Sequence, residues 1–258
     1  MNPIKILFFD IDGTLVDPAT KQISPKTREA IHRLHEKGIL LCVATGRAPA
    51  SLPDFGDLHF DAFCTFNGSL CCTKTETIFH NPIPAEAVQK VIQNVTALGR
   101  PVSIALRDRL VANGVEKDLA DYYALAGLTL TASEDFEEAC QEDVYQIMMG
   151  CREQDHPAII QGAKGVKIAI SWDRAVDVIS DSGGKGTGIR KILEYYHLAP
   201  SQAMAFGDSF NDIEMLQAVG TGVAMGNAPD QLKAIATDVC GPVSADGIYH
   251  YCVAHAII

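Results

Sequence analysis

Two aspartates one residue apart follow a short apolar run near the N-terminus, in the segment Phe8-Phe9-Asp10-Ile11-Asp12-Gly13-Thr14. Successive side chains of a strand point to opposite faces, so a strand through this segment would turn Asp10 and Asp12 the same way and Ile11 into the core. Two carboxylates that face one reacting group are suited to metal-assisted acyl or phosphoryl chemistry. Gly13 allows the chain to leave the strand sharply, at the carboxyl end where open α/β sheets bind ligands. An isolated Asp-Gly cluster is commonly only a turn at the end of a strand, so the rest of the chain must decide.

Three further loops carry polar groups close to short apolar runs. Thr45-Gly46-Arg47 follows residues 39–44, Gly207-Asp208-Ser209-Phe210-Asn211-Asp212 follows residues 203–206, and Lys185 lies in a glycine-rich segment that leads into a helix. Taken singly, such loops are common as turns, helix caps or solvated charges. In a doubly wound sheet they converge on one edge, so together with the two aspartates they predict a single site.

The residue types of these loops favour a divalent metal and a phosphate group. Asp10, Asp208 and a backbone carbonyl offer the hard oxygen ligands that Mg²⁺ prefers. Thr45 can donate from its hydroxyl and its amide to a phosphate oxygen, and the ammonium of Lys185 supplies a positive point charge. Because the chain has a formal net charge of -11, binding an anionic metabolite requires a cation and local donors that reverse the field within the site.

The segments around these loops alternate between strand and helix patterns. Ser24-Pro25 is typical of a helix start and Gly38 of a helix end, which predicts a helix over residues 25–37 between buried strands at 6–9 and 39–44. This order predicts a parallel sheet. After residue 180 the alternation returns, with predicted strands at 203–206, 223–227 and 238–240, helices at 213–219 and 229–236, and a last helix from residue 246.

The middle of the chain has a different character. Pro82-Ile83-Pro84 is typical of a linker, and the strand patterns that follow, at residues 102–106, 144–149 and 166–171, lack the polar ends seen elsewhere. We therefore predict an α/β protein. Its core is a Rossmann-like, doubly wound parallel sheet from residues 1–81 and 180–258, and residues 82–179 form an inserted α+β domain.

Composition argues against several classes of protein. The sequence has no cluster of Lys and Arg, and its net negative charge disfavours a nucleic-acid partner. The first apolar run ends at Asp10 and is too short for a signal sequence or a membrane span, which predicts no membrane partner and a cytoplasmic location. The eight cysteines form no Cys-x-x-Cys pair, so we expect them to be reduced core residues.

The four loops, in this order, resemble the motifs of the haloacid dehalogenase (HAD) superfamily of phosphatases. The large insertion between the second and third motifs resembles the Cof-type subgroup, subfamily IIB with a C2B cap, whose members are most often sugar-phosphate phosphatases. Residues 7–16 and 222–226 add to the resemblance outside the catalytic positions. The resemblance implies hydrolysis of a small phosphorylated metabolite, a phosphate monoester such as a sugar phosphate, with Mg²⁺ as cofactor.

The resemblance also implies a role for each matched residue. Asp10 would be the nucleophile that forms an aspartyl-phosphate, and Asp12 the acid that protonates the leaving alcohol and later activates water. Mg²⁺ would be held by Asp10, Asp208 and the backbone carbonyl of Asp12. The remaining matches would bind the phosphoryl oxygens, through Thr45, Lys185, Asn211 and the amides of Ile11 and Gly46, or support the site, as Arg47 and Asp212 would.

Two other functions stay open on the sequence. A phosphomutase would keep water away from the phospho-aspartate, and a regulatory module would bind phosphate without turnover. The resemblance also disfavours dehalogenation, because Asp12 matches the acid that the family uses on phosphate esters and that its dehalogenases lack. We expect substrate choice to lie in the inserted domain, where candidate contacts to the leaving group are Arg107, Tyr145, Gln146 and Trp172.

Overall fold

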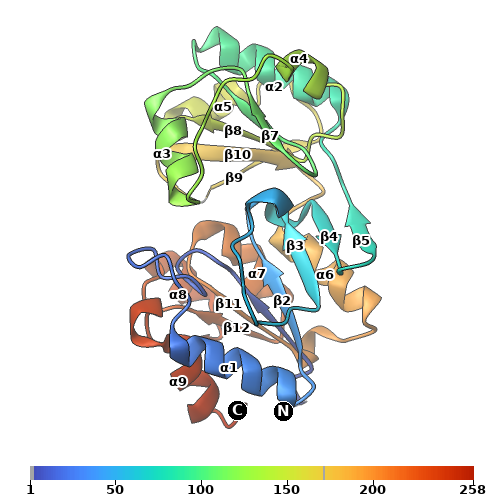
Figure 1. The fold of residues 1–258 in the computed structure, drawn as a ribbon. Coiled ribbons are helices and arrows are strands. Elements are labelled where there is room, and N and C mark those ends of the chain that lie inside the picture. The colour runs from blue at the N-terminus through green and yellow to red at the C-terminus, as the bar shows by residue number, and fades with distance from the viewer. Residues whose placement is uncertain (1–2, 171) are drawn as a thin grey trace. The chain divides into compact units, whose positions relative to one another are not determined.

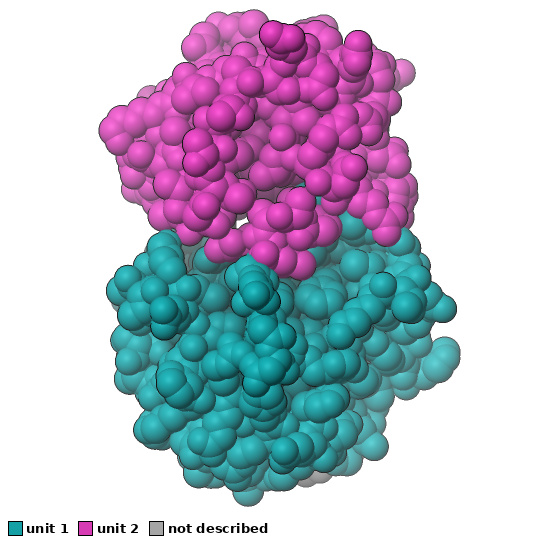
Figure 2. All heavy atoms as spheres, viewed as in Figure 1, with its two compact units in different colours: residues 1–45, 53–79, 185–258 teal, residues 46–52, 80–184 magenta. Residues whose placement is uncertain are grey.

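The computed structural model describes residues 3–170 and 172–258. They form two compact units, coloured separately in Figure 2: the first contains the described residues up to 45, 53–79 and 185–258, and the second contains residues 46–52 and 80–184. The predicted insertion, residues 82–179, falls within the second unit. The second unit also takes in the short segment that follows Thr45.

The first unit is built on an eight-stranded sheet in the order β13-β12-β11-β1-β2-β3-β4-β5 (Figure 1). Neighbouring strands from β13 to β3 run parallel, and β3 and β4 run antiparallel. The predicted α/β fold with a mainly parallel central sheet is confirmed. The strands are β1 (Ile6–Phe9), β2 (Leu40–Ala44), β3 (Ala62–Thr65), β4 (Leu70–Cys72), β5 (Thr77–His80), β11 (Ala203–Gly207), β12 (Thr221–Ala224) and β13 (Asp238–Val239).

Helices cover both faces of this sheet, as the alternation of buried side chains along β1 requires. Ile6 and Phe8 belong to a cluster with side chains of α6 and α7. On the other face Phe9 stacks on Phe206, whose ring meets Tyr251 of α9 edge-on. The helices of this unit are α1 (Pro25–Glu36), α6 (Lys185–Tyr195), α7 (Ile213–Ala218), α8 (Asp230–Ile235) and α9 (Gly247–Ala254), with short 3-10 turns η2 (Phe66–Gly68), η4 (Pro200–Gln202), η5 (Phe210–Asp212) and η6 (Val243–Ala245).

Helix α1 begins where its capping residues predict, whereas the chain leaves the sheet after β3 and β12 although apolar residues follow. The Ser24 hydroxyl accepts a hydrogen bond from the Thr27 amide at 3.1 Å, which caps α1 one residue before Pro25 as predicted. Phe66 directly follows β3 and is apolar like a strand residue, but it has φ 50° and begins η2. The strand predicted at residues 223–227 is β12, which ends earlier, at Ala224.

The second unit has its own five-stranded sheet in the order β7-β6-β8-β10-β9, whose neighbouring strands run antiparallel. Val88 and Val91 of α2 pack against Ile147 on one face of that sheet. The sequence patterns did not mark β10, because Asp177 interrupts its apolar run. The elements are η1 (Pro49–Ser51), α2 (Ala85–Ala97), β6 (Ser103–Ala105), β7 (Leu110–Ala112), α3 (Lys117–Leu125), α4 (Phe136–Ala139), β8 (Gln146–Gly150), η3 (Glu153–Asp155), α5 (His156–Ile159), β9 (Val166–Ala169) and β10 (Ala175–Ser180).

The composition led us to expect no membrane span and reduced cysteines. Across residues 3–170 and 172–258, no helix is both long and apolar enough to span a membrane. All eight cysteines are free thiols, and most of them are buried. They act as small apolar side chains in the two cores.

Candidate active site

The predicted site residues of the first unit lie where neighbouring strands end. Asp10 directly follows β1, Thr45 follows β2 and Asp208 follows β11, while Lys185 is the first residue of α6. Because β11, β1 and β2 are adjacent and parallel, their carboxyl ends share one edge of the sheet, where α/β proteins bind ligands.

Lys185 lies between two carboxylates. Its Nζ atom is 2.6 Å from Oδ1 of Asp10 and 2.6 Å from Oδ1 of Asp212, and its side chain is fully buried. Burial disfavours the charged ammonium, but the two carboxylates outweigh this effect and raise the pKa of Lys185 above its usual range. Lys185 therefore keeps its proton and holds Asp10 and Asp212 together.

Asp212 is occupied by other protein groups. Its Oδ1 atom accepts from Lys185, and its Oδ2 atom accepts from the backbone amides of Asp208 and Ser209 at 2.9 and 3.0 Å. With both oxygens engaged by three donors, Asp212 is better placed to fix the loop after β11 than to bind a ligand. This arrangement agrees with a supporting role.

The carboxylate of Asp208 accepts hydrogen bonds from two side chains. Thr14 donates its hydroxyl to Oδ1 at 2.9 Å, and Asn227 donates its side-chain amide to Oδ2 at 3.2 Å. Burial, followed by the charge of Asp212, raises the pKa of Asp208 to about 7, although the Thr14 hydrogen bond and Lys185 oppose the rise. The positive charge near Asp208 is therefore too small to keep the pKa of its carboxyl group at the usual value.

Asp10 is in a similar electrostatic environment. Its pKa is raised well above the usual value, first by burial, and Lys185 opposes the rise, whereas the charges of Asp212, Asp208 and Asp12 add to it. The negative charges of three carboxylates thus act on Asp10, against the positive charge of one ammonium. An additional cation would lower the electrostatic cost of ionising them.

The donor set fits a divalent cation that prefers oxygen. Asp10, Asp208 and Asp212 each offer a carboxylate oxygen, and these three atoms lie within 4.8 Å of one another. Because Asp212 is already engaged, Asp10 and Asp208 are the two carboxylates that best fit the metal. One or two carboxylates are the usual protein ligands of Mg²⁺, which keeps several waters.

A sequence model of the haloacid dehalogenase-like hydrolases matches residues 7–252. The chain belongs to this family. It is 31% identical to the YkrA protein of Bacillus subtilis over 252 residues, with 95% of each chain covered. It is 27% identical to the pyridoxal phosphate phosphatase YbhA of Escherichia coli, with 98% of this chain and 99% of that protein covered.

A solved structure extends the similarity to the whole fold. The subclass IIB sugar phosphatase BT4131 superposes with a TM-score of 0.92 at 30% identity, over 98% of this chain and 100% of that one. These relatives make the chain a haloacid dehalogenase-like phosphatase of the Cof type, as the motifs predicted. The relatives' names differ in substrate, so they do not name the substrate of this hydrolase.

In this hydrolase the first motif departs from the strand geometry expected from sequence. β1 ends at Phe9, so Asp10 and Asp12 both follow the strand. Asp10 is buried, whereas Asp12 is exposed in the turn, where its backbone pairs with that of Val16. Ile11 is buried between them, and its carbonyl accepts the Val16 amide at 2.7 Å. The two carboxylates therefore have different surroundings, as two different roles would require.

The second motif is divided between the two units. Thr45 is buried at the end of β2, and its amide donates to the Cys64 carbonyl at 2.8 Å. Gly46 and Arg47 belong to the second unit, in which the Arg47 guanidinium donates to the carbonyls of Ser51 and Ala126 at 2.9 and 3.2 Å. The roles predicted for Gly46 and Arg47 remain predictions.

The structure adds three residues to the site that the motif analysis did not assign: Thr14, Asn67 and Asn227. Asn227 donates to the Gly13 carbonyl at 2.9 Å as well as to Asp208, and so joins the first and fourth motif loops. Asn67 accepts a hydrogen bond from Asn211 at 2.9 Å. The partners of Thr14 and Asn67 lie 194 and 144 positions away, and Asn227 bonds to residues 19 and 214 positions away, so no local pattern assigns these contacts.

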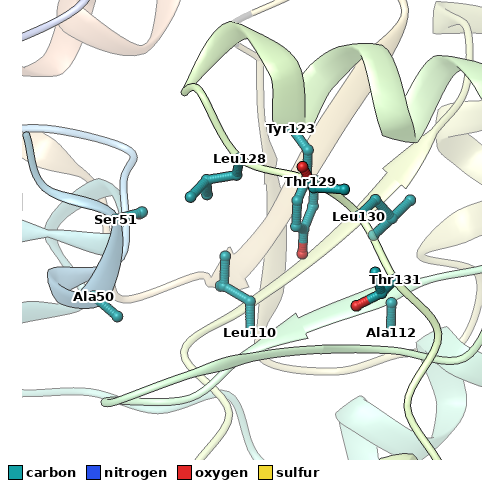
Figure 3. Close-up of a pocket in the computed structure, with 9 residues that line it drawn as sticks. All are labelled: Ala50, Ser51, Leu110, Ala112, Tyr123, Leu128, Thr129, Leu130 and Thr131. Atoms are coloured by element: carbon teal, nitrogen blue, oxygen red, sulfur yellow. The ribbon is translucent and has the colours of Figure 1, made fainter.

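The second unit contains two cavities of its own. One, of about 250 Å³, combines apolar and hydroxyl side chains contributed by η1, β7, Tyr123 of α3 and residues 128–131 after α3 (Figure 3). The other, of about 580 Å³, is lined by Arg107 and Tyr145, two of the predicted leaving-group contacts, with acidic neighbours. Of the other two candidates, Gln146 is buried on β8 and Trp172 stacks on Tyr122.

Proposed function

We propose that this hydrolase is a Mg²⁺-dependent phosphatase that cleaves a small phosphate monoester, with sugar phosphates as the leading substrate class, through an aspartyl-phosphate on Asp10. The observation that carries the proposal is the buried arrangement in which Lys185 bridges Asp10 and Asp212 beside Asp208. It combines a carboxylate nucleophile, a fixed positive charge and the ligands for a divalent cation. Bound Mg²⁺ would neutralise charge on the phosphoryl oxygens.

The first step uses the two aspartates of the first motif. Lys185 engages Oδ1 of Asp10, so we assign Oδ2 to in-line attack on phosphorus. The new bond between Oδ2 and phosphorus forms as the ester bond between phosphorus and the leaving oxygen breaks. Protonated Asp12 gives its proton to that oxygen, which leaves as an alcohol.

The second step returns the enzyme to its starting state. Asp12, now a carboxylate, takes a proton from a water molecule whose oxygen attacks the phosphorus of the aspartyl-phosphate. The bond from phosphorus to Asp10 breaks, and inorganic phosphate is released. The exposure of Asp12 suits a group that must exchange protons with both a leaving group and water.

Binding of the phosphoryl group would use donors on the other loops. We assign this role to Lys185, to the Thr45 hydroxyl, to the Asn211 amide and to the backbone amides of Ile11 and Gly46. Phosphoryl transfer depends mainly on positioning and charge neutralisation, and these groups supply both. Arg47 and Asp212 would support them.

We further propose that residues 82–179 act as a C2B-type cap that selects the leaving group. Supporting this, the second unit has its own sheet, core and cavities. Relatives support a small phosphorylated metabolite as substrate, because YbhA is named a pyridoxal phosphate phosphatase and BT4131 a sugar phosphatase. A cytoplasmic location stays a prediction from the sequence.

The test is release of inorganic phosphate from a panel of sugar phosphates, nucleotides, FMN and pyridoxal phosphate. Wild type is compared with Asp10→Asn and with Asp230→Asn, an exposed aspartate in the first turn of α8, each in Mg²⁺ and in EDTA. We expect turnover by wild type and Asp230→Asn only in Mg²⁺, and none by folded Asp10→Asn. Turnover that survives chelation contradicts the metal role, and turnover by Asp10→Asn contradicts the nucleophile.

A further inference from the structure

The turn η2, which follows β3, has an unusual backbone. Phe66, Asn67 and Gly68 have φ values of 50°, 51° and 87°, so three successive residues lie in the left-handed region. A bulky residue such as phenylalanine rarely adopts this conformation. Such a conformation persists only where the surrounding structure enforces it, which it often does at functional sites.

The turn contacts three elements that carry site residues. The Asn67 amide donates to the Thr45 carbonyl at 3.0 Å, and Oδ1 of Asn67 accepts from the Asn211 side-chain amide at 2.9 Å. Helix α6, which begins at Lys185, packs so closely on the turn that a Cβ atom on Gly188 would lie 3.1 Å from the Cα atom of Gly68. The turn thus connects the second, third and fourth motifs.

The contact with Asn211 fixes the direction of its amide. Ser209 donates its hydroxyl to Oδ1 of Asn211 at 2.6 Å, while Nδ2 of Asn211 donates to Asn67. In this arrangement the oxygen of the Asn211 amide faces Ser209 and its nitrogen faces Asn67. An amide nitrogen carries two hydrogens, and within residues 3–170 and 172–258 the second Nδ2 hydrogen of Asn211 has no acceptor.

We propose that Asn67 is a positioning residue for phosphate: it takes one hydrogen of the Asn211 amide so that the other is presented to a phosphoryl oxygen. This inference rests on the proposed function, because it assumes that the phosphoryl group binds at Asn211. The left-handed backbone of η2 is what lets Asn67 face Asn211 while its own amide stays bonded to Thr45. Asn67 does not itself touch the reacting atoms.

The test compares Asn67→Gly, Asn211→Ala and the double variant, using p-nitrophenyl phosphate turnover and inhibition by inorganic phosphate. Glycine keeps the positive φ and removes the carboxamide side chain, and with it the acceptor that Asn211 uses. We expect Asn67→Gly to lower kcat/KM and weaken phosphate inhibition by about 10- to 100-fold, the scale of a misplaced binding group. The Mg²⁺ concentration for half-maximal activity should stay unchanged. In the Asn211→Ala background the Asn67→Gly change should have no further effect.

Controls separate positioning from folding. His197→Gly makes the same kind of replacement at another left-handed position, φ 54°, on an exposed residue after α6, and should leave kcat/KM unchanged. If Asn67→Gly does not fold, Ser209→Ala releases the other end of the Asn211 amide and should weaken phosphate inhibition in the same direction. Additive losses in the double variant, or a lower Tm with unchanged phosphate inhibition, overturn the proposal.

Failure of the proposed function gives a different result. If wild type releases no phosphate from any substrate, binding of inorganic phosphate in Mg²⁺ is measured by calorimetry for wild type and Asn67→Gly. Weaker binding by the variant supports the positioning role in a protein that binds phosphate without hydrolysis. Equal binding by both proteins, or no binding by wild type, overturns it.

Discussion

Thr14 and Asp208 lie 194 positions apart in the chain, and the Thr14 hydroxyl donates a 2.9 Å hydrogen bond to Oδ1 of Asp208. The donor is 1% exposed, so water cannot readily replace it. This bond opposes the rise in the pKa of Asp208 that burial and Asp212 cause. It therefore both orients the carboxylate and favours its ionised form.

Replacing Thr14 by valine should weaken metal binding. Thr14→Val keeps the size of the side chain and removes the donor, so Asp208 loses its orientation and holds a proton more tightly. We expect the Mg²⁺ concentration for half-maximal activity to rise about tenfold, the lower end of the effect of losing a partner of a metal ligand. Titration of activity with Mg²⁺ measures this, with Thr96→Val on the exposed side of α2 as control. An unchanged midpoint for Thr14→Val would show that the bond does not orient the ligand.

Gly13 leaves room for Asp208, and this gives a second prediction. Gly13 has φ +87°, and a Cβ atom there would lie 2.1 Å from Oδ2 of Asp208. Gly13→Ala should therefore displace the carboxylate and abolish Mg²⁺-dependent turnover. Gly38→Ala is a matched control, since Gly38 has φ +72° and nothing within 4 Å of the added atom.

Gly13→Ala and Gly38→Ala both strain the backbone, but only Gly13→Ala also places an atom against Asp208. Both place alanine in the left-handed region, which should lower the free energy of unfolding by about 1 kcal/mol. Only Gly13→Ala should lose activity. Urea unfolding and phosphate release measured on both proteins separate backbone strain from the contact with Asp208, and equal activity in the two variants would argue against the contact.

Much of the site could be predicted from the sequence because each residue carries its own local signal. Asp10, Lys185 and Asp208 stand at the ends of apolar runs or at a glycine-rich helix start, and the parallel sheet brings those ends to one edge. A residue at the end of a strand or the start of a helix can be predicted from the residues next to it in the chain, because those residues determine where the element ends or begins.

The residues that local pattern could not assign act through distant partners. Asn227 contacts Gly13 across 214 positions, and Asn67 contacts Asn211 across 144, so nothing near either residue shows its role. The left-handed turn at Phe66 was missed for a related reason. Its apolar side chain is typical of a strand, and only the tertiary contacts of η2 impose the conformation.

Binding of Mg²⁺ should depend on pH through Asp208. With the pKa of Asp208 raised to about 7, protons compete with the metal, and affinity should fall about tenfold for each pH unit below 7. In the metal-free protein the folded state binds this proton more tightly than the unfolded chain. That contribution to stability is present below about pH 4 and is lost as pH rises through 7.

Thermal unfolding with and without Mg²⁺ at pH 5.5 and pH 8 measures this linkage. The increase in Tm caused by Mg²⁺ should be larger at pH 8, where the metal meets an ionised carboxylate. Asp208→Asn should reduce the Mg²⁺ effect at both pH values and make it less dependent on pH. A Tm increase of equal size at both pH values in wild type would falsify the assignment of Asp208 as the titrating ligand.

Lys185→Met should lower both stability and turnover, whereas Asp12→Asn should lower turnover with little change in stability. Lys185→Met removes a buried ammonium and leaves Asp10 and Asp212 without the charge that each contacts at 2.6 Å. Breaking a buried ion pair from one side typically costs about 3–5 kcal/mol, so both the free energy of unfolding and turnover should fall. Asp12 is exposed, so Asp12→Asn should lower the rate by about 10²- to 10⁴-fold with little change in stability. Urea denaturation and kcat measured on both variants test this difference, and a stable Lys185→Met protein would show that the two aspartates share a proton instead of relying on the lysine.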